Sequence, residues 1–214
     1  MPQSVIVALI SGRGSNLQAV IDATQNGAIP ARIAAVISNE PDAAGLERAR
    51  QAGIEAIALN HRQFPDRTTF ETELRNCIDA FQPDLLLLAG FMRILGAAFV
   101  QHYHGRMLNI HPSLLPKYRG LDTHARALAA NESWHGASVH FVTAELDGGP
   151  VIVQGRVPVL ETDTPDSLAA RVLQQEHRIY PLVIRWFCEG RLRCQDNQVV
   201  LDGLPLTEPR IMDA

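Results

Sequence analysis

The segment N-I-H-P-S-L-L-P, residues 109–116, carries the side chains with the clearest chemical potential in this chain. Asn109 and His111 are two residues apart at the end of an apolar run, so in a strand they point to the same side. An amide N–H can stabilise an oxyanion, and a neighbouring imidazole can carry a proton. The pair therefore indicates catalysis, although two such residues could equally anchor the following loop by hydrogen bonds.

A carboxylate that could complete this pair lies in E-L-D-G-G-P, residues 145–150. Asp147 falls in the turn of the following predicted hairpin, from which it could reach His111. A carboxylate beside an imidazole favours the imidazolium and orients the ring. Taken alone, Asp147 reads as an ordinary turn aspartate. A serine or cysteine triad is not indicated, because no G-x-S-x-G occurs and no cysteine lies near this cluster.

The segment S-G-R-G-S-N-L, residues 11–17, lies at a predicted strand-to-helix junction. Free amides at a helix start, with glycines that allow close approach, suit a phosphate group. The dinucleotide pattern G-x-G-x-x-G would need a glycine at position 17, where Leu17 stands, so a nicotinamide cofactor is disfavoured. A tight turn with a purely structural role is the alternative.

Six of the eight histidines lie between positions 102 and 140. They form no H-E-x-x-H, and the nearby carboxylates complete no recognised ligand spacing, so we expect no metal.

Five buried strands alternate with four amphipathic helices along the first 110 residues. Strands are predicted at 4–10, 31–38, 54–59, 85–89 and 107–110, and helices at about 15–26, 43–52, 66–81 and 95–102. Continuous apolar runs alternating with helices are typical of a parallel sheet. We therefore predict a Rossmann-like α/β fold, with a mostly parallel sheet and helices on both of its faces.

The regular alternation of predicted strands and helices ends after His111. Residues 111–123 predict an ordered loop, and strands at 137–142 and 151–159 predict an antiparallel hairpin. A long helix should begin at Thr164-Pro165, with Pro181 kinking or breaking it. Residues 192–201 predict a small terminal hairpin. We expect one domain, 1–214, with a phosphate-binding half at about 1–105, a catalytic half at about 106–190 and an antiparallel extension at about 191–214.

Composition excludes several classes of protein. The 214 residues are 46% hydrophobic and 20% charged, as in a globular protein, and the net charge of -4 argues against nucleic-acid partners. The single lysine, Lys117, lies in P-K-Y and not in a G-K-[ST] phosphate loop. Three cysteines without C-x-x-C spacing favour a reducing compartment. Neither a secretory signal nor a membrane-spanning run is evident, so we expect a cytoplasmic protein without membrane partners.

Four motifs in order give the chain a specific resemblance: S-G-R-G-S-N-L-Q, A-G-F-M-R-I-L, L-N-I-H-P-S-L-L-P-K-Y and H-G-A-S-V-H-F-V-T-A-E-L-D-G-G-P. Together they resemble the phosphoribosylglycinamide formyltransferases, the folate-dependent transformylases of purine synthesis, from about Val5 to the helix carrying Q-E-H-R-I-Y-P. The resemblance implies formyl transfer from 10-formyltetrahydrofolate to the primary amine of glycinamide ribonucleotide through a tetrahedral intermediate. It implies these two small-molecule substrates, no metal, and a monomer or weak homodimer.

The resemblance also implies residue roles. Asn109, His111 and Asp147 match the catalytic trio. Matches to the ribonucleotide site are Gly14, Ser15 and Asn16 for phosphate and Glu176 for the ribose hydroxyls. Matches to the folate site are Arg67, Met92, Arg93, Ile94, Leu95, Asn109 and the loop Thr143, Ala144 to Asp147. Ala144 stands where relatives often have Asp, and Arg119 and Asp122 stand where they often have Pro and His.

Three other functions share some of these sequence features. Formyltetrahydrofolate hydrolases resemble this chain but read I-H-H-S in place of I-H-P-S, and they carry an extra N-terminal domain. Methionyl-tRNA formyltransferases append a C-terminal RNA-binding barrel, whereas fewer than about 30 residues are expected here after the long helix. A nucleotide sensor that has lost its chemistry would need no trio of this kind. We expect none of these three to describe the chain.

Overall fold

The computed structural model of the protein describes residues 3–214, and the chain divides into two compact units, 1–108 and 109–214. Met1 and Pro2, which the predicted single domain includes, lie outside the described residues. Strand β5 (Met107–His111) begins in the first unit and ends in the second. The single-domain organisation stays a prediction.

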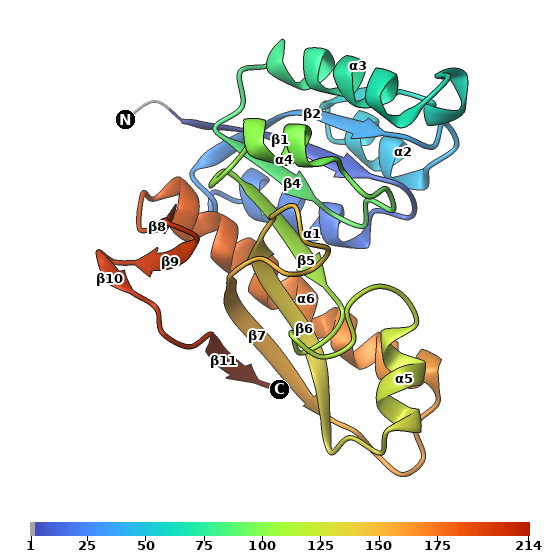
Figure 1. The fold of residues 1–214 in the computed structure, drawn as a ribbon, viewed down its shortest axis with the longest axis vertical. Helices are drawn as coiled ribbons and strands as arrows, with labels where there is room; N and C mark the ends of the chain where they lie inside the picture. The colour runs from blue at the N-terminus through green and yellow to red at the C-terminus, as the bar shows by residue number, and fades with distance from the viewer. Residues whose placement is uncertain (1–2) are drawn as a thin grey trace. The chain divides into compact units, whose positions relative to one another are not determined.

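The first unit is built on a parallel sheet. Its strands are β1 (Ser4–Ile10), β2 (Ala31–Ser38), β3 (Glu55–Ala58) and β4 (Leu85–Leu88), in the order β4-β1-β2-β3 (Figure 1). All neighbouring pairs are parallel. Every residue of β4 is buried, as is β1 from Ile6 onward. Burial on both faces explains why these strands read as continuous apolar runs, and it confirms the predicted parallel strands.

Helices connect these strands. They are α1 (Ser15–Gln25), α2 (Ala44–Gln51), the 3-10 turn η1 (His61–Gln63), α3 (Arg67–Asp79) and α4 (Ala97–His102). Helices α1 and α3 lie on opposite faces of the sheet, as right-handed crossovers in opposite directions require (Figure 1). Asp66 caps α3, because its side chain accepts a hydrogen bond of 2.8 Å from the Thr69 amide. The prediction of helices on both faces is therefore confirmed.

The second unit has strand order β11-β7-β6-β5. Strands β6 (Trp134–Phe141) and β7 (Val151–Pro158) pair antiparallel as predicted, and α6 (Pro165–Cys188) packs along both of them (Figure 1). Helix α6 begins with a capping box of Thr164 and Ser167. It runs unbroken through Pro181, so the expected break is wrong, whereas the alternative of a kink at Pro181 stays a prediction. Buried residues before and after the proline, including Ile179 and Val183, hold both halves of the helix against the strands.

The remaining elements are short. The predicted terminal hairpin is β8 (Leu192–Gln195) with β9 (Gln198–Leu201), extended by β10 (Leu204–Pro205) into a three-stranded antiparallel sheet. Helix α5 (Thr123–Ala129) and strand β11 (Arg210–Asp213), which pairs parallel with β7, were not predicted. In the described part of the chain, no helix combines the length and hydrophobicity needed to cross a bilayer.

Candidate active site

Asn109 and His111 lie at the carboxyl end of β5, separated by the buried Ile110. His111 is only 6% exposed, whereas Asn109 is half-buried. Because side chains alternate along a strand, both point to the same side. The predicted juxtaposition of an amide and an imidazole is therefore present.

Both ring nitrogens of His111 face protein groups. Nε2 lies 2.9 Å from the carbonyl oxygen of Tyr118, and Nδ1 lies 3.5 Å from Oδ2 of Asp147. A carbonyl oxygen only accepts, so Nε2 carries a hydrogen and donates it. Nδ1 is then the nitrogen that faces the carboxylate.

Asp147 reaches this position from the loop between β6 and β7. Its backbone is left-handed, with φ of 47°, and its side chain is 8% exposed. The Gly120 amide donates to Oδ2 at 2.9 Å. Gly149 closes the loop tightly, because a Cβ there would lie 1.8 Å from the Phe141 carbonyl oxygen. The loop thus holds a nearly buried carboxylate against the imidazole, and it also contacts the segment that follows β5.

A fourth side chain belongs to this cluster, and the sequence analysis assigned it no role. His140, on β6, is 2% exposed, and its Nε2 lies 3.1 Å from Nδ2 of Asn109. Its Nδ1 lies 2.9 Å from the Phe141 carbonyl oxygen. Burial lowers the pKa of His140 to about 4, against weaker opposing effects of that carbonyl and of Asp147. The predicted strand 137–142 alternates, and His140 falls on the face opposite the apolar Val139 and Phe141, so the sequence carried no signal of its burial.

Two buried polar side chains, Ser138 and Gln154, support the turn after His111. The sequence analysis did not predict this role. The Ser138 hydroxyl donates to the Ser113 carbonyl at 2.6 Å and accepts from the Leu115 amide at 3.0 Å. The Gln154 amide donates to the Leu115 carbonyl at 2.8 Å and to the Ser138 hydroxyl at 2.9 Å. These contacts fix the chain immediately after the imidazole.

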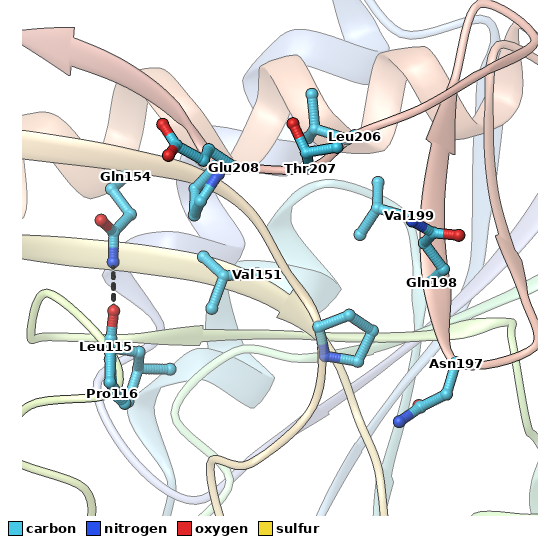
Figure 2. Close-up of a pocket in the computed structure, with 12 residues that line it drawn as sticks. Leu115, Pro116, Val151, Gln154, Asn197, Gln198, Val199, Leu206, Thr207 and Glu208 are labelled. Atoms are coloured by element: carbon cyan, nitrogen blue, oxygen red, sulfur yellow. Dashed lines mark hydrogen bonds between the residues drawn. The ribbon is translucent and has the colours of Figure 1, made fainter.

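A pocket of about 480 Å³ in the second unit adjoins this turn, and Figure 2 shows the Gln154 amide aimed at the Leu115 carbonyl on its wall. Pro116, Val151 and Leu206 also line the pocket. Gln154 and Leu115 both line this pocket, so the hydrogen bond that supports the turn lies at the pocket wall.

Two other histidines of the cluster at 102–140 pair with each other. Nε2 of His135 lies 3.1 Å from Nδ1 of His124, and burial lowers both pKa values, that of His135 to about 4. Within residues 3–214, no group of three His, Cys, Asp or Glu side chains is placed to hold a metal ion.

The predicted phosphate loop lies in the first unit, before α1. Gly14 is the N-cap residue in a left-handed conformation, with φ of 70°. A Cβ at Gly14 would lie 2.8 Å from the Cα of Gly45, so only glycine fits. Ser15 and Asn16 form the first turn of α1, where backbone amides have no partner within the helix. The loop therefore has the geometry that an anion-binding helix start requires.

The predicted folate segment 92–95 lies beside this loop within the same unit. The Ser11 hydroxyl accepts a hydrogen bond of 2.7 Å from the Met92 amide. Met92 and Ile94 are 68% and 62% exposed, whereas Leu95 is buried and Arg93 is half-buried. Exposed apolar side chains on an irregular segment are available to a flat, partly apolar ligand.

Arg67 is connected to that segment through one carboxylate. Its Nε lies 3.7 Å from Oε1 of Glu71, which accepts a hydrogen bond of 2.8 Å from the Gly96 amide. Glu71 thus connects Arg67 to the segment that carries the other predicted folate residues of the first unit.

The other predicted binding residues lie in the second unit. Thr143 and Ala144 begin the loop that carries Asp147, and the Thr143 hydroxyl donates to the Glu145 carbonyl at 3.4 Å. Arg119, one of the unusual residues of the 112–122 loop, forms an ion pair with Glu145. Glu176 is 8% exposed in the middle of α6.

Comparisons with known proteins identify relatives of this chain. The family model described as formyl transferase matches residues 4–184. Phosphoribosylglycinamide formyltransferase of Escherichia coli (strain K12) is 59% identical over 198 residues, which cover 92% of this chain and 93% of that protein. The chain belongs to the formyl transferase family.

Solved structures of related proteins are similar to this formyl transferase in fold. Phosphoribosylglycinamide formyltransferase from Coxiella burnetii superimposes with a TM-score of 0.94 at 56% identity, covering 98% of this chain and 99% of that one. A formyltetrahydrofolate deformylase from Pseudomonas putida superimposes with a TM-score of 0.83 at 26% identity, covering 93% of this chain and 70% of that one. The predicted enzyme class and Rossmann-like fold are confirmed.

Proposed function

We propose that this formyl transferase moves a formyl group from 10-formyltetrahydrofolate to the primary amine of glycinamide ribonucleotide, in de novo purine biosynthesis. The observation that carries the proposal is the cluster at the end of β5, where the Asn109 amide lies two residues from an imidazole facing a nearly buried carboxylate. The high identity to a curated phosphoribosylglycinamide formyltransferase supports the choice of acceptor.

The chemistry needs a place for negative charge and a path for a proton. The amine nitrogen attacks the formyl carbon, and the carbonyl electron pair moves to oxygen to give a tetrahedral oxyanion. An Asn109 N–H donates to this oxygen, and a protonated His111 stabilises it by its charge. The oxyanion then re-forms the carbonyl as the bond from carbon to folate N10 breaks.

Proton transfer accompanies these steps. The attacking nitrogen loses a proton, and folate N10 gains one as it leaves, so the overall transfer is balanced. The mobile proton is on Nδ1 of His111, because Nε2–H is engaged by the Tyr118 carbonyl. It moves through Nδ1 or through a water held by Asp147. No metal and no covalent enzyme intermediate are required.

Binding roles follow residue by residue. The phosphate binds at the start of α1, at Gly14, Ser15 and Asn16, where the positive end of the helix dipole favours an anion. Glu176 holds the ribose hydroxyls. The folate is held by Arg67, Met92, Arg93, Ile94 and Leu95, and by Asn109, Thr143, Ala144 and Asp147. Binding energy at the phosphate then contributes to orienting the reacting amine.

The direct test mixes the protein with both substrates and follows folate absorbance together with the mass of the ribonucleotide. We expect tetrahydrofolate and formylated ribonucleotide in equal amounts, at a rate that a chelator leaves unchanged. Release of free formate, independent of the ribonucleotide, would instead assign hydrolysis, the activity named for the Pseudomonas putida neighbour. Absence of both products from folded protein would refute the proposal.

A further inference from the structure

His140 has a defined tautomer because of the backbone group beside it. Nδ1 lies 2.9 Å from the carbonyl oxygen of Phe141, which can only accept a hydrogen bond. Nδ1 therefore carries the hydrogen. In a neutral ring, the other nitrogen, Nε2, then presents a lone pair.

The surroundings keep this ring neutral. The side chain is 2% exposed, and desolvation is the largest influence on its pKa, which lies near 4. Three charged or titratable side chains act on this ring. The Asp147 carboxylate favours the charged ring, and its Oδ1 lies 3.9 Å from Nε2. His111 and Arg119 favour the neutral ring. The burial cost outweighs the carboxylate at this distance.

A lone pair on Nε2 decides which end of the Asn109 amide it faces. The two side chains are 3.1 Å apart, so the Asn109 group in contact is its N–H₂, which donates. The reversed amide would set its carbonyl oxygen against the lone pair, and two acceptors would repel each other. One N–H is thus engaged by His140, and the amide has a single preferred orientation.

We propose that His140 is a positioning residue that orients the Asn109 amide so that its second N–H, and not its carbonyl oxygen, meets the developing oxyanion. This inference rests on the proposed function, since it concerns the oxyanion of formyl transfer. A reversed amide would place a carbonyl dipole against negative charge and would oppose the reaction. Neutral His140 is required, because an imidazolium would present a second donor to the Asn109 N–H₂.

Two similar variants separate this role from simple packing. In His140→Gln, the amide oxygen extends about as far as Nε2 and can accept from Asn109. In His140→Asn, the shorter side chain reaches only the position of Nδ1, so it can contact the Phe141 carbonyl but not Asn109. Both variants place a neutral amide at the same buried position. They therefore form a matched pair for folding and thermal stability.

We expect kcat of His140→Asn to fall on the order of 100-fold, as for a misplaced catalytic group, while KM changes little. His140→Gln should keep kcat at least roughly tenfold above the Asn variant. In an Asn109→Ala background, His140→Asn should cause no further loss, because the residue through which it acts is gone. Equal kcat in the two variants, or an undiminished further loss in that background, would overturn the proposal.

The tautomer of His140 can also be measured directly, without an activity assay. Nitrogen-15 NMR of the parent protein should show His140 as the neutral, Nδ1-protonated tautomer from about pH 6 to pH 8. An Nε2-protonated ring, or a titration within that range, would refute the proposal whatever the activity. If the parent lacks formyl transfer but shows the expected tautomer, the proposed function fails while the orientation of Asn109 stands.

Discussion

Replacement of Asp147 by Asn removes a negative charge next to His111 while nearly keeping the shape. Oδ2 lies 3.5 Å from Nδ1 of His111 and 2.9 Å from the Gly120 amide, so the asparagine oxygen can keep the Gly120 hydrogen bond. Two unit charges at 3.5 Å interact by about 5 kcal/mol at an effective dielectric constant of about 20. With imidazolium as the active form, removal of the carboxylate weakens the charge that stabilises the oxyanion, and we expect kcat to fall by about 100- to 1000-fold.

The pH–rate profile distinguishes the two possible roles of His111. If imidazolium is the active form, activity is lost as pH rises, and Asp147→Asn moves this alkaline limb to lower pH. If the neutral ring acts as general base, the acidic limb belongs to His111 and moves down while the alkaline limb stays. The apparent values belong to the coupled pair.

The assay compares these profiles with an NMR titration of His111 in parent and variant. Asp163→Asn is the matched control: it makes the same change at an aspartate of the second unit whose side chain is 2% exposed and pairs with Arg171. We expect it to leave the profile unchanged. An identical His111 titration with and without the Asp147 carboxylate would refute the pairing and the mechanism built on it.

Three further predictions use the same protein. Asn109→Ala should lower kcat by about 100- to 1000-fold with the fold intact, since one oxyanion donor is lost, and a rate within a few-fold of the parent would contradict this role. Ser15→Asp adds a negative charge at the start of α1, so it should weaken ribonucleotide binding in calorimetry and leave folate binding nearly unchanged; equal loss of both ligands would make the loop structural. Hydrogen bonds from Arg171 hold the pKa of Asp163 well below its usual range. This stabilisation exists above the unfolded pKa of about 3.9 and disappears as pH falls through the folded value. Asp163→Asn should therefore cost about 2 kcal/mol in urea unfolding at neutral pH, and the difference should shrink in acid.

The parallel strands and their helices could be predicted because their signals are local. A strand such as β4, buried along its whole length, needs apolar residues at every position, and Asp66 caps α3 within its own turn. Helix α5 gave no such signal, because it has seven residues and follows Asp122, whose side chain makes no cap hydrogen bond. Strand β11 depends on pairing with β7 across more than fifty residues of sequence, a long-range contact that four residues cannot encode locally.

Within the candidate site, the residues named in motifs were predictable, and the residues that position them were not. Ser138 and Gln154 act through hydrogen bonds to the backbone of Leu115, so their partners have no side-chain signature. Spacing cannot reveal a carbonyl acceptor, because every residue has one. From the sequence alone, Gln154 is therefore an ordinary position of the strand predicted at 151–159.

Backbone carbonyls determine which ring nitrogen of each histidine in the site carries a hydrogen. In His111 a carbonyl engages Nε2, which leaves Nδ1 for Asp147, and in His140 a carbonyl engages Nδ1, which leaves Nε2 for Asn109. His111 is 3.5 Å from the carboxylate, whereas His140 is 3.9 Å from it and more deeply buried. With a pKa of about 4, His140 stays neutral through the range in which a primary amine can attack, so its Nε2 can only accept a hydrogen bond. A pH–rate limb near neutrality therefore cannot arise from His140, and its movement in Asp147→Asn would report on His111.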